Sequence, residues 1–137
     1  MSRYISDTLR RLVATRANFR CEYCRVPEIG TFYSLQIDHI TSLKHSGETA
    51  AENLAYACTL CNRSKGTDLG TRLEKGGAII PFFNPRRDDW FEHFEADENG
   101  VIVPKSLIGE ATTKIFGMNH ADSIIERKLL IASGKYP

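Results

Sequence analysis

Apolar and polar positions recur at helical spacing near the start of the chain. Ser6 and Asp7 offer oxygen acceptors to the free N–H groups of a first helical turn, which is typical of a helix start. Leu9, Leu12 and Val13 follow on one side of the helix, and the arginines between them fall largely on the other. This pattern predicts an amphipathic N-terminal helix.

A strand and a short helix are predicted on either side of a polar loop. Residues 31–40 are rich in β-branched and aromatic side chains, which favours a strand. Residues 41–52 are mostly polar and contain Ser46-Gly47, which is typical of a loop. A short apolar stretch follows at residues 54–57. Thr59 is then placed to cap a short helix that ends before Gly66.

The second half of the chain has the pattern of a hairpin followed by two helices. Residues 90–95 and 101–103 flank the turn signal Asn99-Gly100, which favours a β-hairpin. Residues 106–116 and 121–132 have apolar positions at helical spacing, and Gly134 stands where the last helix would stop. No repeat or linker interrupts the chain. We therefore expect one α+β domain of residues 1–137, with a core at about 16–68 and an extension at about 76–137 packed on it.

Length and composition indicate the size of the domain and where in the cell the protein is expected. A chain of 137 residues with 42% hydrophobic and 26% charged residues is ordinary for one small globular domain. No apolar run approaches the length of a membrane span, and residues 1–11 lack the apolar centre of a signal peptide. These observations predict a cytoplasmic protein that does not contact a membrane.

The net charge does not by itself indicate a nucleic-acid partner. It is formally +1, but residues 1–36 carry six arginines against three acids, and residues 76–100 carry two against six. Phosphate binding would have to depend on a local patch and on bound metal. Five arginines could line such a surface, namely Arg10, Arg11, Arg16, Arg20 and Arg25. The alternative is that they simply form a solvated helix face.

All four cysteines stand in two C-x-x-C pairs, Cys21/Cys24 and Cys58/Cys61, separated by residues 25–57. Such pairs without an export signal indicate reduced thiolates that bind one tetrahedral zinc ion. Four cysteines complete the coordination, so this zinc is expected to be structural and to hold residues 31–40 beside the short helix. The alternatives are a redox motif or unrelated free thiols.

Between the cysteine pairs lie the residues that a metal-assisted phosphodiester hydrolase needs. His39 can act as general base because an imidazole titrates near neutral pH. Asp38 and Asn62 offer oxygen ligands, which suit Mg²⁺ or Mn²⁺. Neighbouring strand residues point to opposite faces, so Asp38 and His39 can share a site only where the strand ends or twists.

Asn53 could hold the polar loop or orient the His39 ring. Lys65 lies three residues after Asn62, on about the same helix face, and could touch phosphate. Taken singly, these residues have simpler interpretations as turn, cap or surface residues. The candidate nucleic-acid contacts are Lys65, Arg63, Arg20 and Arg16.

In their joint order, these residues resemble a known family. The matching residues are Cys21-x-x-Cys24, Asp38-His39-Ile40, Gly47, Glu52-Asn53-Leu54 and Cys58-x-x-Cys61-Asn62-x-x-Lys65. Residues 16–65 thus resemble an HNH endonuclease of the ββα-metal nuclease superfamily, in its zinc-stapled four-cysteine form. The resemblance implies a ββα-metal core with an N-terminal helix and a C-terminal extension made of a hairpin and helices. Asn62 replaces the third name-giving histidine, as in the H-N-N variant.

The resemblance also implies roles for these residues. His39 would be the general base, Asn53 would orient the loop, and Asp38 with Asn62 would hold a catalytic Mg²⁺ or Mn²⁺. The implied activity is hydrolysis of DNA phosphodiester bonds by a metal-dependent endonuclease, with RNA or branched DNA as open alternatives. One such site would nick, so a double-strand break would need a dimer, a partner protein or two successive events.

The competing hypothesis is a non-catalytic zinc module that binds nucleic acid or protein. It uses the same cysteines but does not need Asp38, His39 and Asn62 together. In the extension, His93 could be a further ligand or phosphate contact, although a packed or surface histidine is the simpler interpretation. Trp90 is expected in the core.

Overall fold

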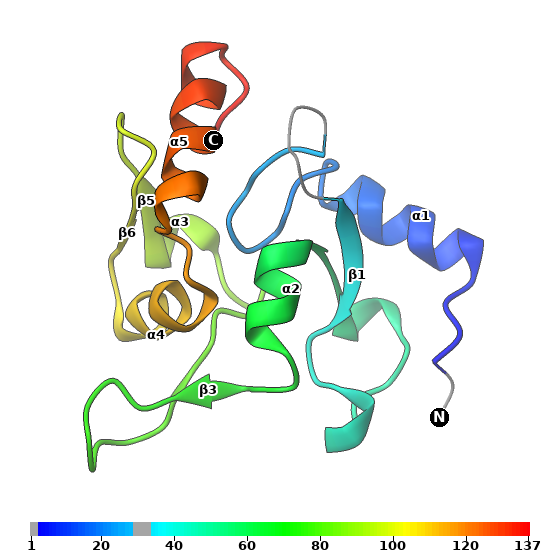
Figure 1. Ribbon diagram of the computed structural model, residues 1–137. Helices are drawn as coiled ribbons and strands as arrows, with labels where there is room; N and C mark the ends of the chain where they lie inside the picture. Colours follow the sequence, from blue (N-terminus) through cyan, green and yellow to red (C-terminus); the bar gives the residue numbers. More distant parts are fainter. Residues whose placement is uncertain (1–2, 29–33) are drawn as a thin grey trace.

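A computed structural model gives the structure of residues 3–28 and 34–137 (Figure 1). Residues 31–33, which belong to the predicted strand, lie outside the described residues. Helix α2 (Thr59–Lys65) lies at the centre of the molecule in Figure 1. Helix α1 (Asp7–Arg16) and strand β1 (Leu35–His39) lie on one side of it, and the C-terminal elements lie on the other.

Helix α1 begins as its sequence predicts. The Ser6 hydroxyl accepts a hydrogen bond from the backbone N–H of Leu9 at 3.2 Å and so caps the first turn. Val13 is fully buried in a small cluster with Leu54 and Tyr56. Leu12, expected on the same inner side, is instead 46% exposed. The buried stripe of this helix is therefore narrower than its sequence pattern suggested.

The centre of the fold is an antiparallel hairpin of β1 and β2 (Leu54–Cys58). Its register sets Asp38 opposite Ala55 and His39 opposite Leu54. All five residues of β2 are buried because α1 packs near one face of the hairpin and α2 near the other. The long connection contains two short 3-10 turns, η1 (Leu43–His45) and η2 (Ala51–Asn53).

Helix α2 begins one residue earlier than its sequence suggested. The cap is Cys58, whose sulfur accepts from the N–H of Cys61 at 3.4 Å, and Thr59 is the first helical residue. The sulfur takes this place because it belongs to the cysteine cluster that fixes the start of the helix. The helix contacts β1, β2 and helix α4 (Leu107–Phe116), so it joins the hairpin to the extension.

The extension contains two more small sheets and three helices. Strand β3 (Gly70–Thr71) pairs with β4 (Ile80–Pro81), and β5 (Phe94–Ala96) pairs with β6 (Ile102–Pro104), all antiparallel. The predicted turn at residues 99–100 closes the second hairpin, with Gly100 at a φ of 86°. Residues 90–93 differ from the prediction because they form a short helix, α3 (Trp90–His93), and not a strand.

The final two helices follow the predicted ranges closely. Helix α4 is capped by Ser106, and helix α5 spans Ala121–Ala132. The buried faces differ from simple amphipathic stripes, because Leu107 of α4 is 57% exposed and Arg127 of α5 is buried. Arg127 is accommodated because backbone and side-chain oxygens accept its hydrogen bonds.

One hydrophobic core spans the cysteine region and the extension. Buried residues from residues 21–61 and from residues 82–136 belong to the same contact cluster. Trp90 lies in it, and its indole N–H donates to the carbonyl of Tyr23 at 2.8 Å, as the core placement predicted. The shared core supports the expectation of one domain, which stays a prediction. Among the described residues, no helix is both long and apolar enough to cross a lipid bilayer.

Candidate functional site

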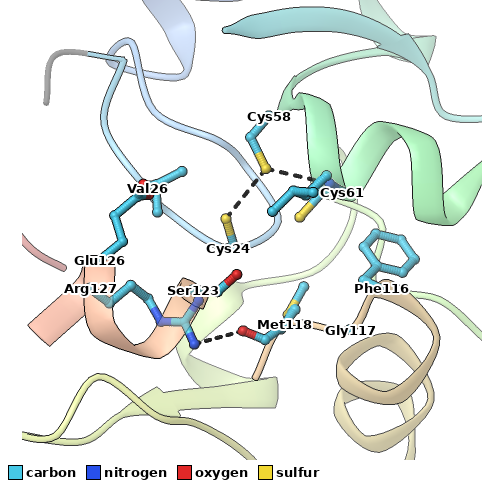
Figure 2. Close-up of a pocket in the computed structure, with 11 residues that line it drawn as sticks. Cys24, Val26, Cys58, Cys61, Phe116, Gly117, Met118, Ser123, Glu126 and Arg127 are labelled. Atoms are coloured by element: carbon cyan, nitrogen blue, oxygen red, sulfur yellow. Dashed lines mark hydrogen bonds between the residues drawn. The ribbon is translucent and has the colours of Figure 1, made fainter. Parts of the chain in front are cut away.

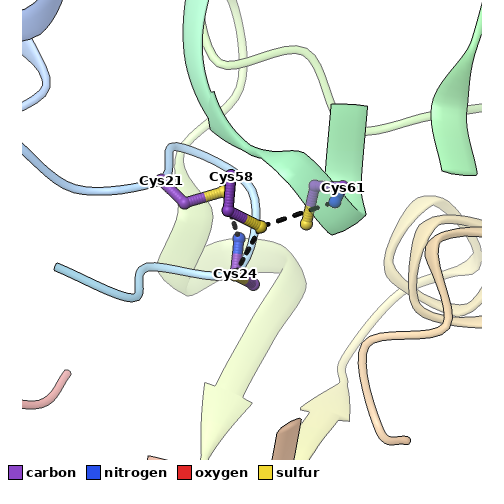
Figure 3. Close-up of side chains that lie close together, drawn as sticks. All are labelled: Cys21, Cys24, Cys58 and Cys61. Carbon is purple, nitrogen blue, oxygen red and sulfur yellow. Dashed lines mark hydrogen bonds between the residues drawn. The ribbon is translucent and has the colours of Figure 1, made fainter. Parts of the chain in front are cut away.

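The four cysteines come together at the start of α2 (Figure 3). Their sulfur atoms all lie within 4.8 Å of one another and are buried, and the sulfurs of Cys24 and Cys58 are 3.7 Å apart. In each C-x-x-C pair, the N–H of the second cysteine points at the sulfur of the first, at 3.4 Å. Two turns of the chain thus present four sulfurs to one point.

This geometry fits one tetrahedral metal ion. Four sulfurs each about 2.3 Å from a zinc ion would lie roughly 3.8 Å apart, close to the Cys24–Cys58 separation. Burial raises the pKa of the Cys21 thiol, but hydrogen bonds from the other three cysteines outweigh it and hold the pKa of Cys21 well below its usual value. The pKa values of Cys24 and Cys61 are raised well above their usual value, first by their hydrogen bonds with Cys21. Without metal the cluster therefore favours negative charge on Cys21, and a bound ion would have to displace protons from the other sulfurs.

The extension closes over this cluster (Figure 2). Arg127 of α5 is 1% exposed and donates to the carbonyl oxygens of Gly100 and Met118 at 2.6 and 2.7 Å. The Tyr136 hydroxyl donates to the carbonyl of Cys24 at 2.7 Å, and burial raises the pKa of Tyr136. The Tyr136 hydroxyl therefore supports the cysteine turn, whereas Arg127 lines the same pocket and joins two turns of the extension.

Asp38 is buried on the face of β1 that α2 covers. Its Oδ2 accepts from the Tyr23 hydroxyl at 2.9 Å and lies 3.3 Å from the Lys65 ammonium, which also reaches Oδ1 at 3.4 Å. Burial raises the pKa of the Asp38 carboxyl, while Lys65 and Tyr23 act in the opposite direction. Both carboxylate oxygens thus have protein partners.

His39 lies on the other face of the strand end, opposite Leu54. Its Nε2 is 3.0 Å from the Thr49 hydroxyl, which belongs to the polar loop. The ring lines a surface pocket of about 260 Å³ together with Arg3 and Lys44, whose side chains are exposed. Strand alternation thus turns the His39 ring away from the face that α2 covers, but His39 still lies close enough to Asp38 for the two side chains to interact electrostatically.

Asn53 ties the two ends of the polar loop together. Its Oδ1 accepts from the Thr41 N–H at 2.9 Å, and its Nδ2 donates to the carbonyls of Thr41 and Glu48, both at 2.8 Å. A β-carbon at Gly47 would overlap the Thr41 carbonyl, so only glycine fits beside this junction. This arrangement is what a loop-orienting asparagine requires.

Asn62 reaches β1 from the first turns of α2. Its Nδ2 donates to Oε1 of Gln36 at 2.6 Å, two residues before Asp38 on the same strand face. Asn62 and Asp38 thus belong to the same contact between helix and strand. As oxygen ligands both suit Mg²⁺ or Mn²⁺, and the Lys65 ammonium, which contacts both carboxylate oxygens of Asp38, would repel a divalent ion bound there.

Comparison with known protein families identifies the segment that contains the cysteines, the hairpin and α2. The model of the family described as HNH endonuclease matches residues 21–68. Residues 21–68 form an HNH domain. The match confirms the resemblance drawn from the motif residues, and it covers the cysteine cluster, the hairpin and α2.

One curated relative matches along most of the chain. It is the Septu protein PtuB of Bacillus mycoides (strain KBAB4), which is 25% identical over 150 residues. The match covers 90% of this chain, but the chain spans only about half (51%) of the length of that protein. No solved structure matches the chain.

The candidate nucleic-acid contacts have different surroundings. Arg63 is exposed on α2, whereas Lys65 is 2% exposed and engaged with Asp38. Arg16 donates to the carbonyl of Leu54 at 2.6 Å, and Arg20 donates to the carbonyls of residues 25 and 135. Their roles toward nucleic acid stay predictions.

Other residues singled out from the sequence have structural partners. The Nδ1 of His93 is 2.6 Å from the Ser106 hydroxyl, and the metal-ligand cluster found among the described residues does not include His93. Arg86 forms an ion pair with Glu22 and not with the aspartates that follow it in the sequence. His45 and His120 are exposed. The contact with Ser106 agrees with the simpler interpretation of His93 as a packed histidine.

Sequence reasoning missed three residues around the HNH domain's polar groups. Arg3 and Lys44 flank His39, and Tyr23 binds Asp38. Arg3 precedes the first helix, and no spacing rule relates it to a strand end more than thirty residues away. Tyr23 sits between the first two cysteines, so its position in the C-x-x-C turn was the one available signal.

Proposed function

We propose that the HNH domain hydrolyses phosphodiester bonds in nucleic acid, with DNA as the first substrate to test and His39 as the general base. The observation that carries the proposal is the place of His39, which lines a surface pocket together with two exposed cations, Arg3 and Lys44. A phosphodiester bears one negative charge, so cations beside the base would attract and orient it.

The contact with Thr49 supports the role of His39. If the Nε2–H donates to the Thr49 hydroxyl, Nδ1 keeps its lone pair and can take a proton from water. Asn53 would serve this arrangement by holding the loop that carries Thr49. Thr49 and Asn53 are then positioning residues.

Two metal sites belong to the proposal. The cysteine cluster would hold a structural zinc, since four sulfurs fill its coordination. Asp38 and Asn62 would supply oxygen ligands to Mg²⁺ or Mn²⁺, and such an ion stabilises negative charge on the phosphate when bound. Four buried reduced thiols suit the cytoplasm, which we keep as the proposed location.

The test is nicking of supercoiled plasmid by purified, zinc-loaded protein in Mg²⁺ or Mn²⁺, with and without EDTA. His39→Ala should lose roughly 10²- to 10⁴-fold in rate, as expected for removal of a general base. His45→Ala is the matched control, because His45 is an exposed histidine of the same loop. Zinc content and circular dichroism should be unchanged in both variants.

The outcomes separate the hypotheses. Metal-dependent nicking that His39→Ala abolishes and His45→Ala retains supports the nuclease. Equal nicking by wild type and His39→Ala overturns the assignment of the base. If folded wild type cuts neither plasmid, single-stranded DNA nor RNA, the domain is better described as a binding module. The same substrates decide between DNA and RNA, and light scattering with and without DNA tests for a dimer.

A further inference from the structure

Lys65 is an unusual lysine because its charged end is buried. Its side chain is 3% exposed, and its ammonium lies 3.3 Å from Oδ2 of Asp38 and 3.0 Å from the carbonyl oxygen of His39. Lysine is rarely buried unless it is paired. Here its partners are the carboxylate proposed to bind a divalent ion and the backbone of the proposed base.

The ammonium therefore takes the cation position beside Asp38. Oδ2 is shared between Lys65 and the Tyr23 hydroxyl, and Oδ1 faces Lys65. A divalent ion bound to either oxygen would lie close to a positive charge in a buried setting, where repulsion is strong. Binding of the ion and the present position of Lys65 therefore oppose each other.

On its other side, Lys65 lines a cavity of about 200 Å³ between the HNH domain and the extension. The wall includes Thr41, Asn84 and the exposed side chain of Arg87, with Asp68 as the one acid. Arg87 and Asp68 balance each other in formal charge, so the lining becomes net positive when the Lys65 ammonium turns from Asp38 toward the cavity. A phosphate group in the cavity would offer Lys65 a second anionic partner within the reach of a flexible four-carbon side chain.

We propose that Lys65 exchanges between Asp38 and a phosphate of the nucleic acid in this cavity, so that substrate binding opens the Asp38 site to the divalent ion. The proposal rests on the function proposed for the HNH domain and adds its regulation. Without nucleic acid the site would bind the ion weakly, which would hold back metal-dependent chemistry until a strand is in place. By linkage, the ion and the strand must then raise each other's affinity by the same factor.

The experiment measures Mn²⁺ binding to zinc-loaded protein by electron paramagnetic resonance of the free ion. Lys65→Met should bind Mn²⁺ roughly 5- to 150-fold more tightly than wild type, the usual range of coupling between two sites. Lys65→Arg keeps the charge and should remain weak. Arg63→Met is the matched control, because it removes one charge from the exposed side of the same helix, and its Mn²⁺ affinity should stay within about twofold of wild type.

A second measurement does not depend on the folding of the Lys65→Met protein. In a His39→Ala background, which leaves Lys65 and Asp38 in place, a short DNA duplex should raise Mn²⁺ affinity by a similar factor. Arg87→Met should reduce that increase without changing Mn²⁺ affinity in the absence of DNA. Asp38→Asn should remove the tight Mn²⁺ binding in both settings.

Equal Mn²⁺ affinity in wild type, Lys65→Met and the DNA-bound protein overturns the exchange, even if wild type cuts DNA. Tighter Mn²⁺ binding in Lys65→Arg as well overturns it too, because the charge would then not be the cause. The nicking assay with His39→Ala reports separately on the proposed function. Tight Mn²⁺ binding by Lys65→Met, together with no cutting by the wild-type protein, would support the competition between Lys65 and the ion and reject the nuclease.

Discussion

Replacement of Asn53 tests whether the polar loop positions His39. Asn53→Ala removes three hydrogen bonds, one from the Thr41 N–H and two to the carbonyls of Thr41 and Glu48. These bonds join residue 41, which follows the strand end, to residue 48, which precedes Thr49. The loop would lose the ties that bring Thr49 to the His39 ring.

The size of the effect follows from the number of bonds. A protein hydrogen bond contributes roughly 0.5–1.5 kcal/mol net, so three contribute roughly 1.5–4.5 kcal/mol. Water can replace part of this because the Glu48 bond is exposed. We expect the loop to be destabilised by roughly 1.5–3 kcal/mol, which makes its open form about 10- to 150-fold more populated.

Amide hydrogen exchange at Thr41 and Gly47 in the zinc-loaded protein measures this opening, and nicking rates measure its effect on the site. The matched variant is Asn53→Asp, which can still accept from the Thr41 N–H but sets a carboxylate oxygen against two carbonyl oxygens. It should be at least as damaging as alanine. Thr41 exchange within about twofold of wild type in the alanine variant would refute the reasoning that Asn53 holds the loop.

Three further predictions concern the rest of the chain. Cys61→Ser should lose bound zinc and unfold, as monitored by zinc release and circular dichroism, because structural zinc contributes about 10–16 kcal/mol and small domains have only about 5–15 kcal/mol of stability. Burial and the hydrogen bond to Glu28 raise the pKa of Tyr56 to about 12. The contribution of neutral Tyr56 to folding stability should therefore be complete below about pH 10 and lost as pH rises toward 12. Tyrosinate absorbance, with Tyr56→Phe as reference, checks this. Arg127→Met should cost roughly 3–5 kcal/mol in urea unfolding because it leaves buried carbonyl oxygens without donors, and a cost below about 1 kcal/mol would contradict that account.

The sequence was most informative where function depends on local spacing. Two C-x-x-C turns each fix their own geometry within four residues, so the cysteine cluster could be predicted without knowing the path between Cys24 and Cys58. The same holds for the Ser6 cap of α1 and the turn at Gly100. Helix α5 was predicted over its full range because its apolar residues and the stop at Gly134 are both local signals.

Contacts between distant segments could not be predicted in this way. Strand alternation indicated that Asp38 and His39 point apart, but not that Lys65 would occupy the Asp38 face, because that depends on the angle at which α2 crosses the hairpin. Arg3 reaches His39 only through the path of the chain before α1. Burial of Arg127 was equally hidden, since its acceptors are oxygens of two separate turns. Sequence patterns describe elements, whereas these contacts arise from how elements are packed.

The support of the cysteine turn by Tyr136 has a consequence for biosynthesis. All four sulfur ligands have been made once Cys61 has been added, but the tyrosine that covers the turn comes 75 residues later (62–136). At roughly 5–20 residues per second, the nascent cluster would stay uncovered for about 4–15 seconds. A metal ion bound to the cluster during this interval would still exchange with the pool around the ribosome, so metal supply and thiolate chemistry would select the ion before the closed fold retains it.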